Sequence, residues 1–127
     1  MITSNDKPIV GIVGPCTAGK STLNHGLLAL GIQSRHIAQE HSFVPDMWHR
    51  LIHPDVLIFL DVSYEHSFTR KPLNWTLDEY IEQHRRLEHA RNHANYYLMT
   101  DPFSIIKVRQ MVLGFLASNM IVPIHTT

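Results

Sequence analysis

Residues 9–22 decide the fold and read IVGIVGPCTAGKST. The first five of them are β-branched apart from one glycine, which is typical of a parallel strand covered on both faces. The stretch after them, 14–21, places two glycines five positions apart and ends in lysine and serine. Leu23, Leu27 and Leu30 follow at helical spacing, and Gly31 can end that helix. The pattern therefore predicts a strand, a glycine-rich turn and an amphipathic helix.

This turn has the composition and context of a phosphate-binding P-loop. Gly14 and Gly19 allow the backbone to curl around an anion, and the curled loop aims its N–H groups inward. The helix that follows adds the positive end of its dipole. We predict that a nucleotide phosphate chain lies against the whole segment, which comprises Gly14, Pro15, Cys16, Thr17, Ala18, Gly19, Lys20, Ser21 and Thr22.

Three side chains of the segment have the chemistry of nucleotide binding. Lys20 supplies a positive charge near the β- and γ-phosphates, and the Ser21 hydroxyl is suited to Mg²⁺. Thr22 supports the helix start or nearby phosphate oxygens. We expect the Lys20 side chain to lie outside the core, and Cys16 to fill space without chemistry of its own.

The composition limits the classes of function. A chain of 127 residues predicts one domain, 1–127. Eleven basic residues balance eleven acidic ones, so we expect neither nucleic acid nor a membrane as partner. A single cysteine suits a reducing compartment, and no signal-peptide pattern or apolar run of about 20 residues is present. These features predict a cytoplasmic protein.

The rest of the chain alternates short apolar runs with helical patterns, which predicts an α/β fold with a mostly parallel sheet of four or five strands. Thr76 and Glu79 form a capping box that predicts a helix from Leu77 onward. Further strands are expected at 35–39, 56–60 and 96–99, and further helices at 45–52, 63–70 and from 105, where Ser104 is the expected cap.

Two carboxylates are candidates for orienting Mg²⁺. Asp61 follows the strongest apolar run, as a Walker B aspartate does, and Glu40 follows the expected second strand. The carboxyl ends of parallel strands meet at one edge of a sheet, where the phosphate loop also emerges. The residues alone leave both as candidate metal ligands beside Ser21.

The order of these features resembles the small nucleoside and nucleotide kinases, such as thymidylate, shikimate and gluconate kinases. The resemblance rests on the phosphate loop, segment 55–65, an arginine-bearing loop, and a late strand and helix. It implies a lid with Arg70 and Lys71 over the transferred phosphate, and it favours Glu40 over Asp61 for the metal. It also points to the later arginines Arg85, Arg86 and Arg91. The segment between Gly31 and Asp55 is short for this family. If one strand of the family's five is missing for this reason, the remaining four would have the order 2-1-3-4.

The hypothesis from sequence is an Mg²⁺-dependent kinase that binds ATP and transfers its γ-phosphoryl group to a small acceptor. Lys20 and Arg70 are its predicted catalytic residues. A non-catalytic nucleotide-binding or regulatory module, or a slow NTPase, is the alternative. Among ten histidines, His41 is a candidate for substrate contact, and His89 and His93 have the helical spacing of metal ligands, although a solvated face is the more common arrangement.

Overall fold

The computed structural model describes residues 7–70 and 75–123. Within them a parallel sheet contains β1 (Val10–Val13), β2 (Ser34–His36), β3 (Val56–Asp61) and β4 (Tyr96–Met99). The strands lie in the order β2-β1-β3-β4, with Val10 in register with both Ser34 and Val56. The predicted four-stranded order is confirmed, and the β1 and β3 ends bring the phosphate loop and Asp61 to one edge.

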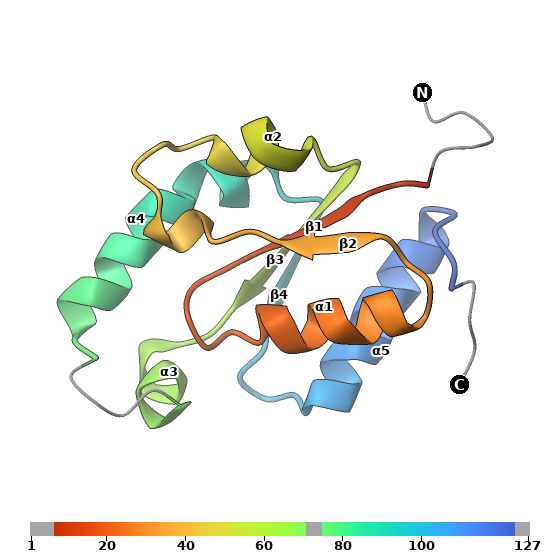
Figure 1. Cartoon of the computed structure of the whole chain (residues 1–127). Coiled ribbons are helices and arrows are strands. Elements are labelled where there is room, and N and C mark those ends of the chain that lie inside the picture. Colours follow the sequence, from red (N-terminus) through yellow and green to blue (C-terminus); the bar gives the residue numbers. More distant parts are fainter. Residues whose placement is uncertain (1–6, 71–74, 124–127) are drawn as a thin grey trace.

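Helices cover both faces of this sheet (Figure 1). On one face, α1 (Lys20–Ala29) and α5 (Ile105–Ser118) bury Leu27, Val112 and Leu116 against Ile58 and its neighbours. On the other face, Trp48 of α2 (Met47–Ile52) and Leu87 of α4 (Leu77–His93) pack against Phe59. The predicted three-layer α/β fold is thus confirmed. The helices, with one 3₁₀ turn, are α1 (Lys20–Ala29), η1 (Gln39–His41), α2 (Met47–Ile52), α3 (Tyr64–Arg70), α4 (Leu77–His93) and α5 (Ile105–Ser118).

The caps read from the sequence are present. Thr76 accepts a hydrogen bond from Glu79 N, and the Glu79 carboxylate accepts one from Thr76 N, which completes the capping box of α4. Ser104 caps α5 in the same way through Lys107 N at 3.1 Å. Gly31, at φ 83°, follows α1 in the left-handed conformation expected of a helix end.

The second strand is shorter than predicted. Pairing with β1 ends at His36, and the chain then turns through η1, which contains Glu40. Glu40 therefore lies beyond the end of β2, in a 3₁₀ turn that brings its side chain to Lys20 of the phosphate loop. Among the described residues, no helix combines the length and apolarity needed to cross a bilayer.

Candidate functional site

The loop between β1 and α1 depends on glycine at both ends. Gly14 has φ 153°, and a Cβ there would lie 1.9 Å from the carbonyl oxygen of Leu60. Gly19 has φ 98° and precedes the first residue of α1 in the left-handed conformation, which glycine adopts without strain. No side chain of the described residues caps this helix, in contrast to α4 and α5. The first N–H groups of α1 can thus donate hydrogen bonds to an anion.

Lys20 is held inside the loop. Its Nζ donates to the carbonyl oxygens of Gly14 at 2.8 Å and Pro15 at 3.1 Å, and to Glu40 Oε2 at 2.8 Å. The ammonium has three N–H donors, so these contacts use all of them. Only 8% of Lys20 is exposed, so the expectation that its side chain lies outside the core was wrong. The loop carbonyls and Glu40 thus fix the position of the Lys20 ammonium.

Glu40 is the buried partner of this lysine. It is 4% exposed and comes from η1, which follows β2. Its Oε2 binds Lys20, whereas its Oε1 is buried without a hydrogen-bond partner among the described residues. An unsatisfied buried carboxylate oxygen is costly and is a natural ligand for a cation. Sequence reasoning named Glu40, and the structure places it beside the loop.

Asp61, the other candidate carboxylate, has partners on both oxygens. Its Oδ1 accepts from His84 Nε2 at 2.9 Å and from Val62 N at 2.8 Å, and its Oδ2 accepts from the Tyr97 hydroxyl. Burial acts to raise the pKa of Asp61, but the hydrogen bonds from His84 and Tyr97 outweigh it and lower that pKa. Burial likewise acts to lower the pKa of His84, and the Asp61 carboxylate raises it overall. The pair is a hydrogen-bonded ion pair between β3 and α4.

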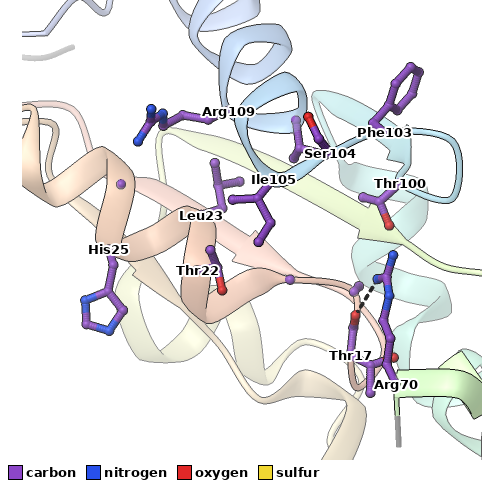
Figure 2. A pocket seen from close by; sticks show the side chains of 14 residues that line it. Thr17, Thr22, Leu23, His25, Arg70, Thr100, Phe103, Ser104, Ile105 and Arg109 are labelled. Carbon is purple, nitrogen blue, oxygen red and sulfur yellow. Dashed lines mark hydrogen bonds between the residues drawn. The ribbon is translucent and has the colours of Figure 1, made fainter. Parts of the chain in front are cut away.

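Arg70 reaches the loop from the end of α3. Its Nη1 donates to the Thr17 carbonyl oxygen at 2.8 Å, and Figure 2 shows this contact at the rim of a cavity. Lys71, the second predicted lid cation, lies outside the described residues. Arg85 and Arg86 both bind Glu82, at 2.6 and 3.0 Å. Arg91 lies over the Tyr97 ring at 4.7 Å. Unlike Arg70, these three arginines do not line the cavity beside the loop.

The cavity beside the loop has a volume of about 680 Å³. Its walls come from the loop, from α1, from Arg70 and from the segment that leads into α5. Figure 2 shows Leu23 and Ile105 near the middle of the view, with Arg109 and Phe103 toward opposite sides of it. This volume suits a small organic ligand, and the lining is mainly apolar with cations at its margins. The α5 contribution was not predicted, because no local pattern links residues 100–109 to the loop.

Gln83 is a further residue that sequence reasoning missed. It is 6% exposed on the inward face of α4, in line with Leu87 and Ala90. Its Oε1 accepts from Cys16 N at 2.9 Å, and its Nε2 donates to Cys16 Sγ at 3.1 Å. This two-point contact fixes the loop to α4. A polar residue on the apolar row of a helix was the signal that could have indicated it.

Ser21 and Thr22 lie exposed in the first turn of α1, next to Gly19. Both hydroxyls are therefore accessible at the uncapped helix end. His89 accepts from Trp48 Nε1 at 3.1 Å and stacks on His93 at 4.3 Å between ring centroids. His41 Nε2 lies 3.8 Å from Glu40 Oε2 and 3.6 Å from Cys16 Sγ, so it adjoins the loop itself.

Comparison with known proteins gives a fold match. No protein-family model matches the chain, and neither does any curated protein sequence. Among solved structures, the fold is similar to shikimate kinase from Acinetobacter baumannii in complex with shikimate, with a TM-score of 0.61 and 14% identity. The match covers 89% of this chain and 94% of that chain. The chain therefore has the P-loop α/β fold, as the resemblance implied.

Proposed function

We propose that this protein is a kinase that binds ATP at the P-loop and transfers its γ-phosphoryl group to a small acceptor. The observation that carries the proposal is the state of Lys20: a buried ammonium held by two loop carbonyls and Glu40, beside an uncapped helix N-terminus. A buried cation next to unpaired N–H groups favours an anion with several oxygens. The similar fold of a kinase in complex with shikimate supports the same class of chemistry.

The nucleotide fits the cavity in one direction. Its phosphates would lie over Gly19 to Thr22, where the N–H groups of α1 point outward. Its base and sugar would then extend along Leu23 and Ile105, between α1 and α5. The apolar walls suit the faces of a flat base, and Arg70 at the loop side is close to where the phosphates would begin.

The residues also fit Mg²⁺. Ser21 offers a hydroxyl, and Glu40 offers the buried Oε1 that has no partner among the described residues. Oxygen ligands of this kind are those that Mg²⁺ prefers, and the ion when bound neutralises charge on the phosphate oxygens. Asp61 is the weaker candidate, because His84, Tyr97 and Val62 N already bind its oxygens. We assign it to positioning α4 on the sheet.

Phosphoryl transfer spreads negative charge over oxygens that cations must stabilise. Lys20 would exchange a loop carbonyl for a phosphate oxygen, while Glu40 keeps its ammonium in place. Arg70 would move from the Thr17 carbonyl to the transferred group. The acceptor is proposed to be smaller than a nucleotide, because between β2 and β3 the chain has room only for η1 and α2.

One observation favours a non-catalytic nucleotide-binding module. Arg85, Arg86 and Arg91 are engaged with Glu82 or Tyr97. Of the two arginines in the described residues that line the cavity, Arg70 and Arg109, Arg70 is the one that contacts the loop. A binding module needs no cation that acts only during transfer. The two hypotheses differ in what Arg70 does.

The test is a screen of small hydroxyl compounds for stimulated release of ADP from ATP. We expect ATP turnover to be slow alone and to rise with the right acceptor, because water is poorly positioned in the acceptor's place. Arg70→Ala should lower the stimulated rate far more than it lowers ATP affinity. Arg85→Ala, an exposed arginine paired with Glu82, is the matched control and should leave both unchanged. Tight ATP binding without stimulation by any compound would favour the module.

A further inference from the structure

Cys16 of the phosphate loop forms a cluster with Glu40 and His41. One ligand atom of each lies within 4.8 Å of the others: the thiol sulfur, an imidazole nitrogen and a carboxylate oxygen. The proposed function uses Glu40 through Lys20 and Mg²⁺, but it gives the thiol and the imidazole no role. Residues 16 and 40–41 come from different segments, so their meeting is a product of the fold.

We propose that this cluster is a binding site for a zinc-like divalent cation. Cys16 Sγ, His41 Nε2 and the Glu40 carboxylate are its ligands, and water fills the open position. A thiolate and an imidazole together select a borderline-soft metal such as Zn²⁺ over Mg²⁺. Three protein ligands with one open position are typical of an accessible zinc site.

The distances suit tetrahedral coordination. With Zn–S of about 2.3 Å and Zn–N of about 2.0 Å, tetrahedral geometry separates sulfur from nitrogen by about 3.5 Å. Cys16 Sγ and His41 Nε2 lie 3.6 Å apart. His41 Nε2 lies 3.8 Å from Glu40 Oε2. Oε2 also binds Lys20, so Glu40 would bind the ion through Oε1, the other oxygen of the same carboxylate, after small shifts of the ligand atoms.

The buried oxygen of Glu40 gives independent support. Glu40 is 4% exposed, and its Oε1 has no hydrogen-bond partner among the described residues, while Oε2 binds Lys20. One carboxylate can therefore keep its lysine on one oxygen and bind a metal through the other. The proposed function offers this same oxygen to Mg²⁺, so the two ions would bind it in alternation. His41 is exposed, which leaves the site open to solvent and to an entering ion.

Gln83 orients the sulfur ligand. Its Nε2 donates to Cys16 Sγ at 3.1 Å, and its Oε1 accepts from Cys16 N at 2.9 Å. Hydrogen bonds of this kind hold a ligand in its binding conformation and strengthen metal affinity. Binding exchanges the thiol proton for the metal, and the proton passes to solvent. The thiolate then offsets one charge of the ion, and the carboxylate is shared between the ion and Lys20.

Zinc titration of the full chain against a chromophoric chelator, with a non-chelating reductant present, tests the site. We expect one tight equivalent in the wild type and a loss of more than about 100-fold in affinity in Cys16→Ser and His41→Gln, since even partners of ligands cost about 10–100-fold. Gln83→Ala should fall within that smaller range. His41 is exposed, so His41→Gln keeps the test valid if Cys16→Ser fails to fold.

The matched control is His93→Gln, which removes an imidazole from the stacked pair of His89 and His93, outside the cluster. It should leave the tight equivalent unchanged. Co²⁺ used as a probe should give a sulfur-to-metal charge-transfer band in the wild type that is absent from Cys16→Ser. Zinc affinity that survives both Cys16→Ser and His41→Gln, or that is lost in His93→Gln instead, would overturn the proposal. These measurements contain no nucleotide, so their outcome is independent of the proposed kinase activity.

Discussion

Two buried carboxylates emerge near the carboxyl edge of this sheet, and their surroundings differ. Glu40 is 4% exposed and Asp61 is 3% exposed, so burial alone does not separate them. Asp61 has hydrogen-bond partners on both oxygens, from β4, from α4 and from the backbone N–H of the next residue, Val62. Glu40 binds Lys20 through one oxygen and keeps the other unpartnered within the described residues. A buried polar group whose hydrogen bonds are satisfied stabilises the fold, whereas an unsatisfied oxygen has the capacity to bind a cation or water.

The contrast extends to the partner of each carboxylate. His84 joins α4 to β3 through Asp61, and both lie away from the loop cavity. Lys20 joins Glu40 to the backbone of the phosphate loop. Two carboxylates that are both candidates in the sequence thus have different surroundings, which suit packing for Asp61 and binding for Glu40. The predictions below test this difference.

The largest effect is expected from Lys20→Ala. The loop loses its buried cation, and a charge-assisted phosphate contact is worth about 1.5–3 kcal/mol, so ATP affinity should fall about ten- to hundredfold. The variant also leaves the Glu40 carboxylate buried without its ammonium, so stability should fall. Calorimetric titration with ATP and Mg²⁺, together with urea unfolding, measures the two effects.

The double variant Lys20→Ala/Glu40→Gln separates the effect on ATP affinity from the effect on stability. Removing the orphaned charge should recover stability, because a neutral amide is cheaper to bury than an unpaired carboxylate. ATP affinity should stay low, since the phosphate contact is still missing. Unchanged ATP affinity in Lys20→Ala would contradict the assignment of the loop.

The next effect compares the carboxylates directly. Mg²⁺ should raise ATP affinity about tenfold less in Glu40→Gln than in the wild type, which corresponds to the lower end of the free energies of contacts to charged groups. ATP binding without metal should stay nearly intact. Asp61→Asn should keep the Mg²⁺ dependence and lose stability instead, because His84 loses its charged partner. ATP titrations with and without Mg²⁺ distinguish the variants. The reverse pattern would restore the Walker B interpretation of Asp61.

The sequence predicts this comparison only in part. Both carboxylates could be placed at the edge, because strands and the P-loop follow from local patterns such as the apolar run 56–60 and the spacing of Gly14 and Gly19. The partners could not be predicted. His84 is 23 positions from Asp61, and Gln83 is 67 from Cys16. Such contacts depend on how α4 packs on the sheet, which no local pattern encodes.

The charge of His84 makes the Asp61 pair dependent on pH. The folded pKa of His84 is raised above 6.5, so its contribution to stability is full below about that pH and is lost as pH rises through the folded pKa. The folded pKa of Asp61 is lowered below 3.8, so its contribution is present above that pH and is lost as pH falls through the folded pKa. The pair therefore stabilises the fold most between these limits.

Urea unfolding of the wild type and His84→Gln from pH 5 to pH 9 measures this dependence. The stability difference between them should be largest at the acidic end and should shrink as His84 loses its proton. In the Asp61→Asn background the same difference should become smaller and nearly independent of pH, because the charged partner is gone. A difference that grows with pH would contradict the ion pair.

The smallest effect is expected from Tyr97→Phe, which removes the hydroxyl that Asp61 Oδ2 accepts from. The Tyr97 side chain is 40% exposed, so water can replace part of the lost contact, and stability should fall by about 1 kcal/mol. Tyr96→Phe is the matched control, because Tyr96 is the neighbour in β4 and stacks on Phe115. Urea unfolding of both variants should show a loss in Tyr97→Phe alone. The decisive measurement is the Mg²⁺ dependence of ATP binding. Tyr97→Phe releases one oxygen of Asp61, so this dependence would change if Asp61 held the metal, and it should stay at the wild-type value if Glu40 does.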